Sequence, residues 1–121
     1  MPAGNAHRIL NTVKDADHVL PDLGAGKIIT TQKDLQICEM VSAAAEARTL
    51  ANPTKAGNRL TLRMKTDGGD ITVTASNGLN VAGNTQAVFA DVGDALDLIS
   101  VSHTTGYRWD ILTNLGSVAL S

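Results

Sequence analysis

Short runs in which apolar and polar residues alternate recur along this sequence, and they constrain its fold more than any other feature. In the clearest run, residues 59–65, the apolar Leu60, Leu62 and Met64 alternate with polar residues. A second run, residues 70–75, has the same period of two. Because successive side chains of a β-strand point to opposite faces, this period predicts strands with one apolar and one polar face.

Residues 66–69 separate these two runs and include two glycines. Glycine tolerates the positive φ angles that tight hairpin turns require, so the sequence predicts an antiparallel hairpin here. In that hairpin Lys65 and Asp70 would lie opposite each other, as a pair of attracting charges.

Turn residues punctuate the rest of the chain at similar intervals. Further strand-like runs cover residues 27–31, 35–42, 79–81, 86–90, 95–101, 107–113 and 118–120. Residues 42–48, rich in Ala and ending in Glu-Ala-Arg, are expected to form a helical turn or two. About eight short strands with no helices to cover a parallel sheet predict an all-β fold, an antiparallel β-sandwich of jelly-roll-like type. The residues expected in its core are Leu60, Leu62, Met64, Ile71, Val73, Leu96, Leu98, Trp109 and Ile111.

The first 25 residues differ from this β-rich body, which we assign to residues 26–121. They contain two of the three prolines, and their apolar pairs, Ile9 with Leu10 and Val19 with Leu20, follow neither a helical nor a strand period. Proline and glycine favour an extended path. Two interpretations of residues 1–25 stay open: an extended arm that lies on a partner, or a flexible tail.

The composition predicts a core of small side chains. A chain of 121 residues makes one domain. Its hydrophobic fraction of 43% is sufficient for a core, but only 2% of its residues are aromatic, and alanine and threonine are abundant. The free energy of burial scales with apolar area, at roughly 25 cal/mol per Å², so such a core stabilises little per residue. We therefore expect a homo-oligomer.

The net charge and the lack of a long apolar run argue against two classes of partner, nucleic acid and membrane. The formal net charge is -2, without the basic excess that is usual in nucleic-acid-binding domains. No apolar run approaches the roughly 20 residues of a membrane-spanning helix, and none near the N-terminus is typical of a signal peptide. We expect a soluble protein that is made in a cytoplasm and binds neither nucleic acid nor membrane.

One strand nevertheless carries a local group of cations. Arg59, Arg63 and Lys65 share the polar face of residues 59–65. This face is either solvated or a contact for an acidic partner protein, and the absence of an accompanying aromatic platform disfavours single-stranded nucleic acid. Trp109, the single tryptophan, is expected to fill the core rather than to stack on a ligand.

The sequence contains no complete motif for a cofactor or a metal ion. Residues 24–27 are similar to the end of a phosphate-binding loop, but proline stands at position 21, where the pattern needs glycine, and isoleucine follows the lysine. The three histidines are scattered, and the single cysteine, Cys38, has apolar neighbours that predict a buried thiol. We expect no cofactor and no metal, and we favour a non-enzymatic role over that of a small β-sandwich hydrolase.

Residues 48–121 resemble a segment that recurs in small virion proteins of tailed bacteriophages. The residues that carry the resemblance are RTL at 48–50, GNRLTL at 57–62, KTDGGDITV at 65–73, DVGDALDLISV at 91–101, RWDIL at 108–112 and GSVALS at 116–121. These runs are similar to those of capsid decoration, or cement, proteins and of head- or tail-fibre modules. Residues 1–47 carry little of the resemblance.

The resemblance implies a structural virion protein on the capsid surface. Such a protein clamps neighbouring subunits of the major capsid protein from outside, and by analogy a trimer is favoured over a dimer. The alternative is a fibre or receptor-binding module, although the long repeated shaft usual in fibres is missing. The residues expected to contact the capsid are Ile9, Leu10, Val19, Leu20, Arg59, Arg63 and Lys65.

Overall fold

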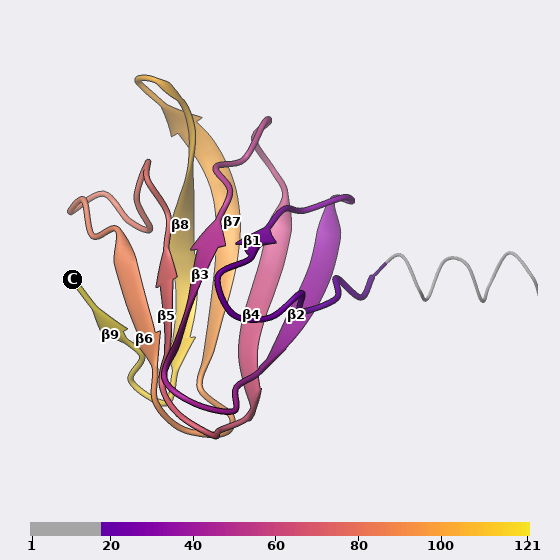
Figure 1. Cartoon of the computed structure of the whole chain (residues 1–121). Helices are drawn as coiled ribbons and strands as arrows, with labels where there is room; N and C mark the ends of the chain where they lie inside the picture. The colour runs from indigo at the N-terminus through magenta and orange to yellow at the C-terminus, as the bar shows by residue number, and fades with distance from the viewer. Residues whose placement is uncertain (1–17) are drawn as a thin grey trace, which may run out of the picture.

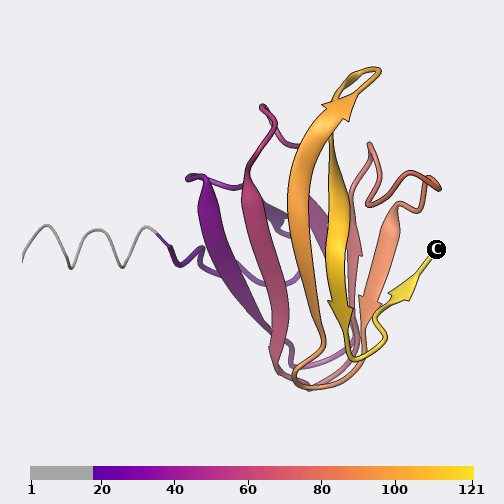
Figure 2. The same ribbon diagram turned by 180° about the vertical axis from the view of Figure 1, so that it is seen from behind.

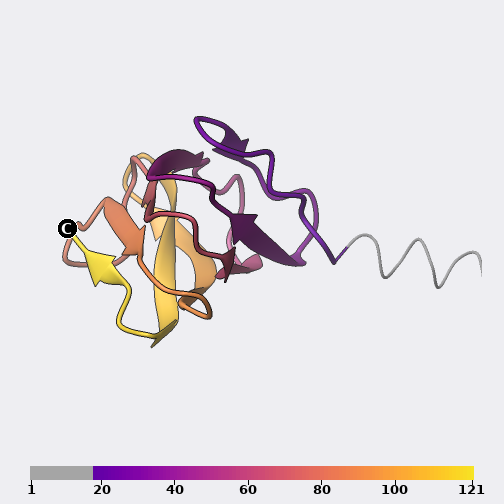
Figure 3. The same ribbon diagram turned by 60° about the horizontal axis from the view of Figure 1, so that its bottom comes forward.

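The structure, a computed structural model, describes residues 18–121 and is all-β over that range. Its strands form two sheets that pack face to face, one of five strands and one of four (Figure 1, Figure 3). The strands are β1 (Ile28–Ile29), β2 (Leu35–Val41), β3 (Glu46–Leu50), β4 (Arg59–Thr66), β5 (Ile71–Thr74), β6 (Gln86–Phe89), β7 (Ala95–His103), β8 (Gly106–Leu115) and β9 (Ala119–Leu120). The expected all-β class is confirmed, in a sandwich-like arrangement.

Both sheets are mixed, whereas the sequence predicted antiparallel ones. The five-stranded sheet has the order β1-β3-β5-β6-β9, and the four-stranded sheet, in front in Figure 2, has the order β2-β4-β7-β8. The pairs β1–β3, β2–β4 and β3–β5 are parallel, and the other pairs are antiparallel. The first five strands alternate between the sheets, so strands two apart along the chain become neighbours that run the same way.

The hairpin expected between residues 59–65 and 70–75 does not form. β4 belongs to the four-stranded sheet and β5 to the five-stranded sheet, so the chain between them crosses the sandwich and Lys65 and Asp70 are not a cross-strand pair. The glycines of this crossing give room rather than a positive φ. A Cβ atom on Gly68 would collide with the backbone of Ser42 and Ala43, and one on Gly69 with the backbone of Ala44.

Two further expectations about local structure were wrong. Residues 42–48, expected as a helical turn, instead form a bend followed by the first half of β3, which lies between β1 and β5. The helix preference of Ala, Glu and Arg is worth only tenths of a kcal/mol per residue, and sheet partners on both sides outweigh it. Residues 79–81, expected as a strand, form a bend and turn instead.

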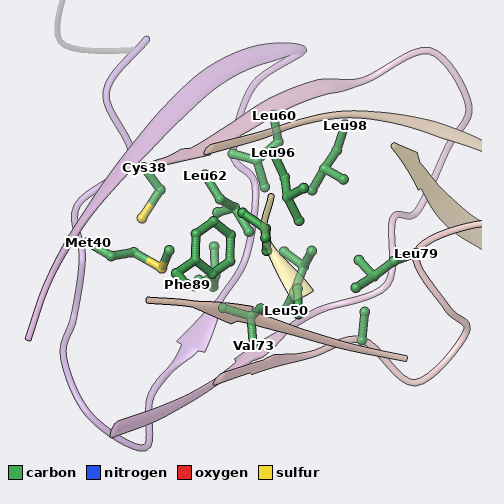
Figure 4. Packing of buried hydrophobic residues seen from close by; sticks show 14 of the residues in the cluster. Cys38, Met40, Leu50, Leu60, Leu62, Val73, Leu79, Phe89, Leu96 and Leu98 are labelled. Atoms are coloured by element: carbon green, nitrogen blue, oxygen red, sulfur yellow. The ribbon is translucent and has the colours of Figure 1, made fainter. Parts of the chain in front are cut away.

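The core lies between the sheets and is mainly aliphatic, as the composition predicts (Figure 4). All nine expected core residues contribute to it, eight of them fully buried and Ile111 partly. Trp109 is fully buried, and its Nε1–H donates to the carbonyl oxygen of Ala51 at 3.0 Å. Cys38 is also buried, on the inner face of β2. Period-two alternation therefore identified the inner faces correctly even where strand pairing was misjudged.

Residues 18–27, here called the N-terminal strap, lie against the body. The backbone N–H of Leu20 donates to the carbonyl of Ile37, and the N–H of Ile37 donates to the carbonyl of His18, both at 2.8 Å. At its other end, the N–H of Gly26 donates to Ala47 of β3 at 2.7 Å. The strap thus runs from the edge of the four-stranded sheet to that of the five-stranded sheet.

A buried ion pair fixes the strap. Arg48 points inward from β3, and its Nε and Nη2 lie 2.7 Å and 2.9 Å from the two carboxylate oxygens of Asp22. The same guanidinium donates to Glu46 and to the carbonyl of Val41, and the Asp22 carboxylate accepts the N–H groups of Val41 and Gly24. The Arg48 side chain has no exposed surface, so these hydrogen bonds compensate the loss of its water.

Candidate functional site

The cations expected to share an outward face, Arg59, Arg63 and Lys65, do so along β4. Neighbouring strands supply acidic partners for two of them: Arg59 Nη2 lies 3.0 Å from Asp97 Oδ2, and Arg63 Nη1 lies 3.3 Å from Glu39 Oε2. In each of these ion pairs the arginine side chain is about two-fifths exposed to solvent. Ion pairs exposed to this degree stabilise a fold by about 0–1 kcal/mol. The face therefore presents alternating signs of charge rather than a basic patch.

Cross-strand rows describe this outer face of the four-stranded sheet. From β2 to β8 the successive rows are Leu35–Arg59–Ile99–Asp110, Ile37–Thr61–Asp97–Thr113 and Glu39–Arg63–Ala95–Leu115. Every row contains a charged residue beside exposed or half-exposed apolar ones. A shallow hollow of about 230 Å³ opens on this face between Thr61, Ala95, Asp97, Thr113 and Leu115.

The outer face of the five-stranded sheet has a different chemistry. Two rows each cross four of its five strands: Ile28–Thr49–Thr74–Gln86, from β1 to β6, and Ala47–Thr72–Val88–Ala119, from β3 to β9. All eight side chains are exposed or half-exposed, and none is charged. The sequence reasoning missed this surface, although the outward threonines of residues 70–75 were a usable signal.

An apolar hollow adjoins this uncharged face at its β1 edge. It has a volume of about 370 Å³, and the strap and the chain around β1 line it with Leu20, Pro21, Leu23, Ile28, Ile29, Thr30 and Gln32. Leu23 and Ile28 are 66% and 57% exposed. Because Ile28 belongs both to the outer row and to the hollow, the two surfaces are continuous.

The four apolar residues expected to contact a capsid have different surroundings. Ile9 and Leu10 lie outside the described residues. Val19 is 55% exposed and forms a parallel bridge with Ile37. Leu20, in contrast, is 7% exposed and packs into the core, so its side chain is already covered by this chain.

The ionisable groups do not assemble into a metal centre within residues 18–121, where no three His, Cys, Asp or Glu side chains come together as ligands. Burial, and then the negative charge of Asp22, raise the pKa of the Cys38 thiol to about 11. Asp94, one of three aspartates spaced by three, accepts the N–H groups of Ala90 and Asp91 and so stabilises a turn. The described part of the chain also has no helix capable of crossing a bilayer.

Comparison of the sequence with protein-family models and with curated proteins finds no match.

Proposed function

We propose that this chain is a structural virion protein that decorates the outside of a bacteriophage capsid and clamps neighbouring subunits of the major capsid protein. In this proposal the working form is a homo-oligomer, and the role is structural rather than catalytic. The protein is made in the host cytoplasm and then resides on the capsid surface. The resemblance of residues 48–121 to phage virion modules supports the proposal, because it covers most of the sandwich.

The observation that carries the proposal furthest is that both outer faces of a small sandwich are open and chemically distinct. A clamp needs more than one contact surface, and the paired charges of one sheet and the uncharged rows of the other offer two. Mixed charges on a face orient a partner, whereas uncharged small side chains lose little conformational entropy on contact.

The proposal extends to the form of the sandwich and to the N-terminal arm. In this proposal the sandwich is a mixed-sheet variant of the jelly-roll-like form that the strand pattern predicts, with residues 1–25 as an arm that reaches a neighbouring subunit. Residues 18–25 of that arm are its anchored end, held to the body through Leu20 and Asp22. A chain spans up to about 3.3 Å per extended residue, so the residues before His18 are long enough to pass from one capsid subunit to the next.

The test is copy number on purified particles of the phage that encodes the chain. Quantitative mass spectrometry is expected to find hundreds of copies per particle. A handful of copies would favour the fibre or receptor-binding module, and none would overturn both.

The arm is tested by deleting residues 2–17, a boundary that retains Leu20 in the core and Asp22 beside Arg48. The truncated protein is expected to keep its far-UV circular dichroism spectrum but to sediment with particles at least tenfold less. Equal sedimentation would assign attachment to the sandwich faces instead.

A further inference from the structure

We propose that the uncharged outer face of the five-stranded sheet is the surface through which two copies of this chain associate. The inference rests on the homo-oligomer in the proposed function and identifies where its subunits meet. It also predicts the symmetry: a face that pairs with itself is related to its partner by a two-fold axis, so the unit is a dimer. The trimer favoured by resemblance would need a second, different contact.

The composition of the face is that of an interface centre. Interface centres are depleted in charged residues, and polar groups gather at the rim. The middle strand, β5, contributes Thr72 and Thr74, each half-exposed, with Thr49 and Val88 beside them on the flanking strands. The exposed Asp70 immediately precedes β5, at the margin of the face, where a polar rim belongs.

The absence of charge in the two rows favours a second copy as the occupant. A two-fold axis brings side chains near the axis against their own counterparts, so any charge there would meet the same charge. The uncharged rows avoid this repulsion, which would destabilise a self-contact. The four-stranded sheet lacks this property, because Arg59, Arg63 and Asp97 occupy the middle of its face.

The side chains also suit close approach. Threonine, alanine and valine are short and lose little rotamer freedom, so ordering them opposes association less than ordering lysine or glutamate would. Short side chains let two sheets approach within the roughly 10 Å that separates packed sheets. The hollow beside Ile28 extends the apolar area beyond the rows and would be covered by the same partner.

The expected affinity follows from the area. Five strands about 4.8 Å apart, presenting about four residues each, cover roughly 300 Å². A stable complex buries roughly 800 Å² on each partner, so even with the hollow we expect a weak dimer that forms at about 100 µM and above. On a particle, neighbouring copies held close together would reach such local concentrations.

The test is sedimentation velocity of the purified full chain from about 5 µM to 1 mM. The wild type is expected to shift from monomer to dimer. Thr72→Lys is expected to weaken association at least tenfold, because the new ammonium meets its counterpart across the axis. The matched control is Thr61→Lys, a half-exposed threonine on the other outer face whose cross-strand neighbour is Asp97, and it is expected to dimerise like the wild type.

A charge-swap experiment makes the result independent of any single variant. Thr74→Lys and Thr74→Glu are each expected to be monomeric alone, and their equimolar mixture is expected to form a heterodimer. Circular dichroism and thermal unfolding of each variant check its fold. If the wild type stays monomeric at 1 mM, forms only trimers, or associates equally well after both single charges, the inference is overturned. Copy number on particles is measured separately, so a monomer that still coats particles would refute this contact and leave the proposed function standing.

Discussion

The two outer faces of this sandwich are built from the same backbone pattern but carry opposite surface chemistry. On the four-stranded sheet, Arg59, Arg63 and Arg108 each pair with a nearby carboxylate. On the five-stranded sheet, the two rows that each cross four strands contain only Ile, Ala, Val, Thr and Gln. The inner faces, in contrast, are alike, since both bury aliphatic side chains in one core.

This difference shows which surface property the fold requires: both sheets need an aliphatic inner face, whereas the charge on their outer faces can vary. Both sheets form with or without charge on the outside, so outer charge is not a requirement of the architecture. Exposed ion pairs stabilise little, and a surface rich in threonine is compatible with strands. The two faces are therefore free to differ in charge, and the proposed subunit contact lies on the uncharged one.

The largest loss of stability is expected from a change to the ion pair that is buried inside the sandwich rather than to those on its surface. Asp22→Ala leaves the buried guanidinium of Arg48 without its main partner, and we expect the free energy of unfolding to fall by about 3–5 kcal/mol. Urea denaturation measures the loss. The control, Asp34→Ala, removes the exposed ion pair with Lys55 and should lower stability by less than about 1 kcal/mol. Equal losses would show that burial of the pair does not distinguish it from surface charge.

A second, smaller effect depends on pH. Burial raises the pKa of Asp22, but hydrogen bonds from Arg48, Val41 and Gly24 outweigh it, so the pKa lies below its ordinary value of 3.8. A carboxyl with a lowered pKa stabilises the fold above its unfolded pKa, and this contribution is lost as pH falls through the folded value. We expect wild-type stability to decline below about pH 4.

Asp22→Asn tests that assignment. The variant should be less stable than the wild type at pH 7 and should decline less steeply between pH 4 and pH 2. Glu46, whose pKa is also lowered, would supply part of the remaining slope. An unchanged slope in Asp22→Asn, followed by urea denaturation across this range, would assign the acid sensitivity to other carboxylates.

The charged outer face should show a modest effect that depends on salt. Glu39→Lys removes the partner of Arg63 and adds another cation beside it, and we expect a loss of about 1 kcal/mol at low ionic strength. Because salt screens exposed charges, most of this loss should disappear in 1 M NaCl. Thermal unfolding at both salt concentrations measures it, and a loss that salt leaves unchanged would point to packing rather than charge.

The uncharged outer face should show the smallest effect on the monomer. Thr74→Lys places one cation among neutral neighbours, and we expect the free energy of unfolding to change by less than about 0.5 kcal/mol. The measurement is urea denaturation near 5 µM, where the chain should be monomeric. A large loss here would mean that the threonine rows serve the fold itself, and it would remove the distinction between the two faces.

The sequence predicted the faces of the strands better than their partners. Alternation in residues 59–65 and 70–75 placed Leu62 and Val73 in the core correctly, because a period of two is a local property. The turn between those runs looks like a hairpin, but Gly68 and Gly69 are needed there for another reason: a Cβ atom on either would collide with the backbone of residues 42–45. That contact is between segments far apart along the chain, so no local pattern reveals it.

The same limit applies to the candidate surfaces. The outward direction of Arg59 and Arg63 could be predicted, but their neutralisation by Asp97 and Glu39 depends on which strands become neighbours. Arg48 belongs to one of the runs that carry the resemblance, but its burial against Asp22 could not be foreseen, since it requires the strap to pass over β3. The uncharged rows likewise exist only once β1, β3, β5, β6 and β9 are placed in register.

The alternation of the first five strands between the sheets has a consequence for the order of assembly. The β7–β8 hairpin joins residues adjacent along the chain and can close early, on a timescale of about microseconds. Each parallel pair, in contrast, is separated along the chain by a whole strand of the opposite sheet, so closing it costs more loop entropy than closing the hairpin. We expect the β7–β8 hairpin to form first and the parallel pairs of the first five strands to form afterwards. Formation of these parallel pairs is then expected to limit the rate of refolding.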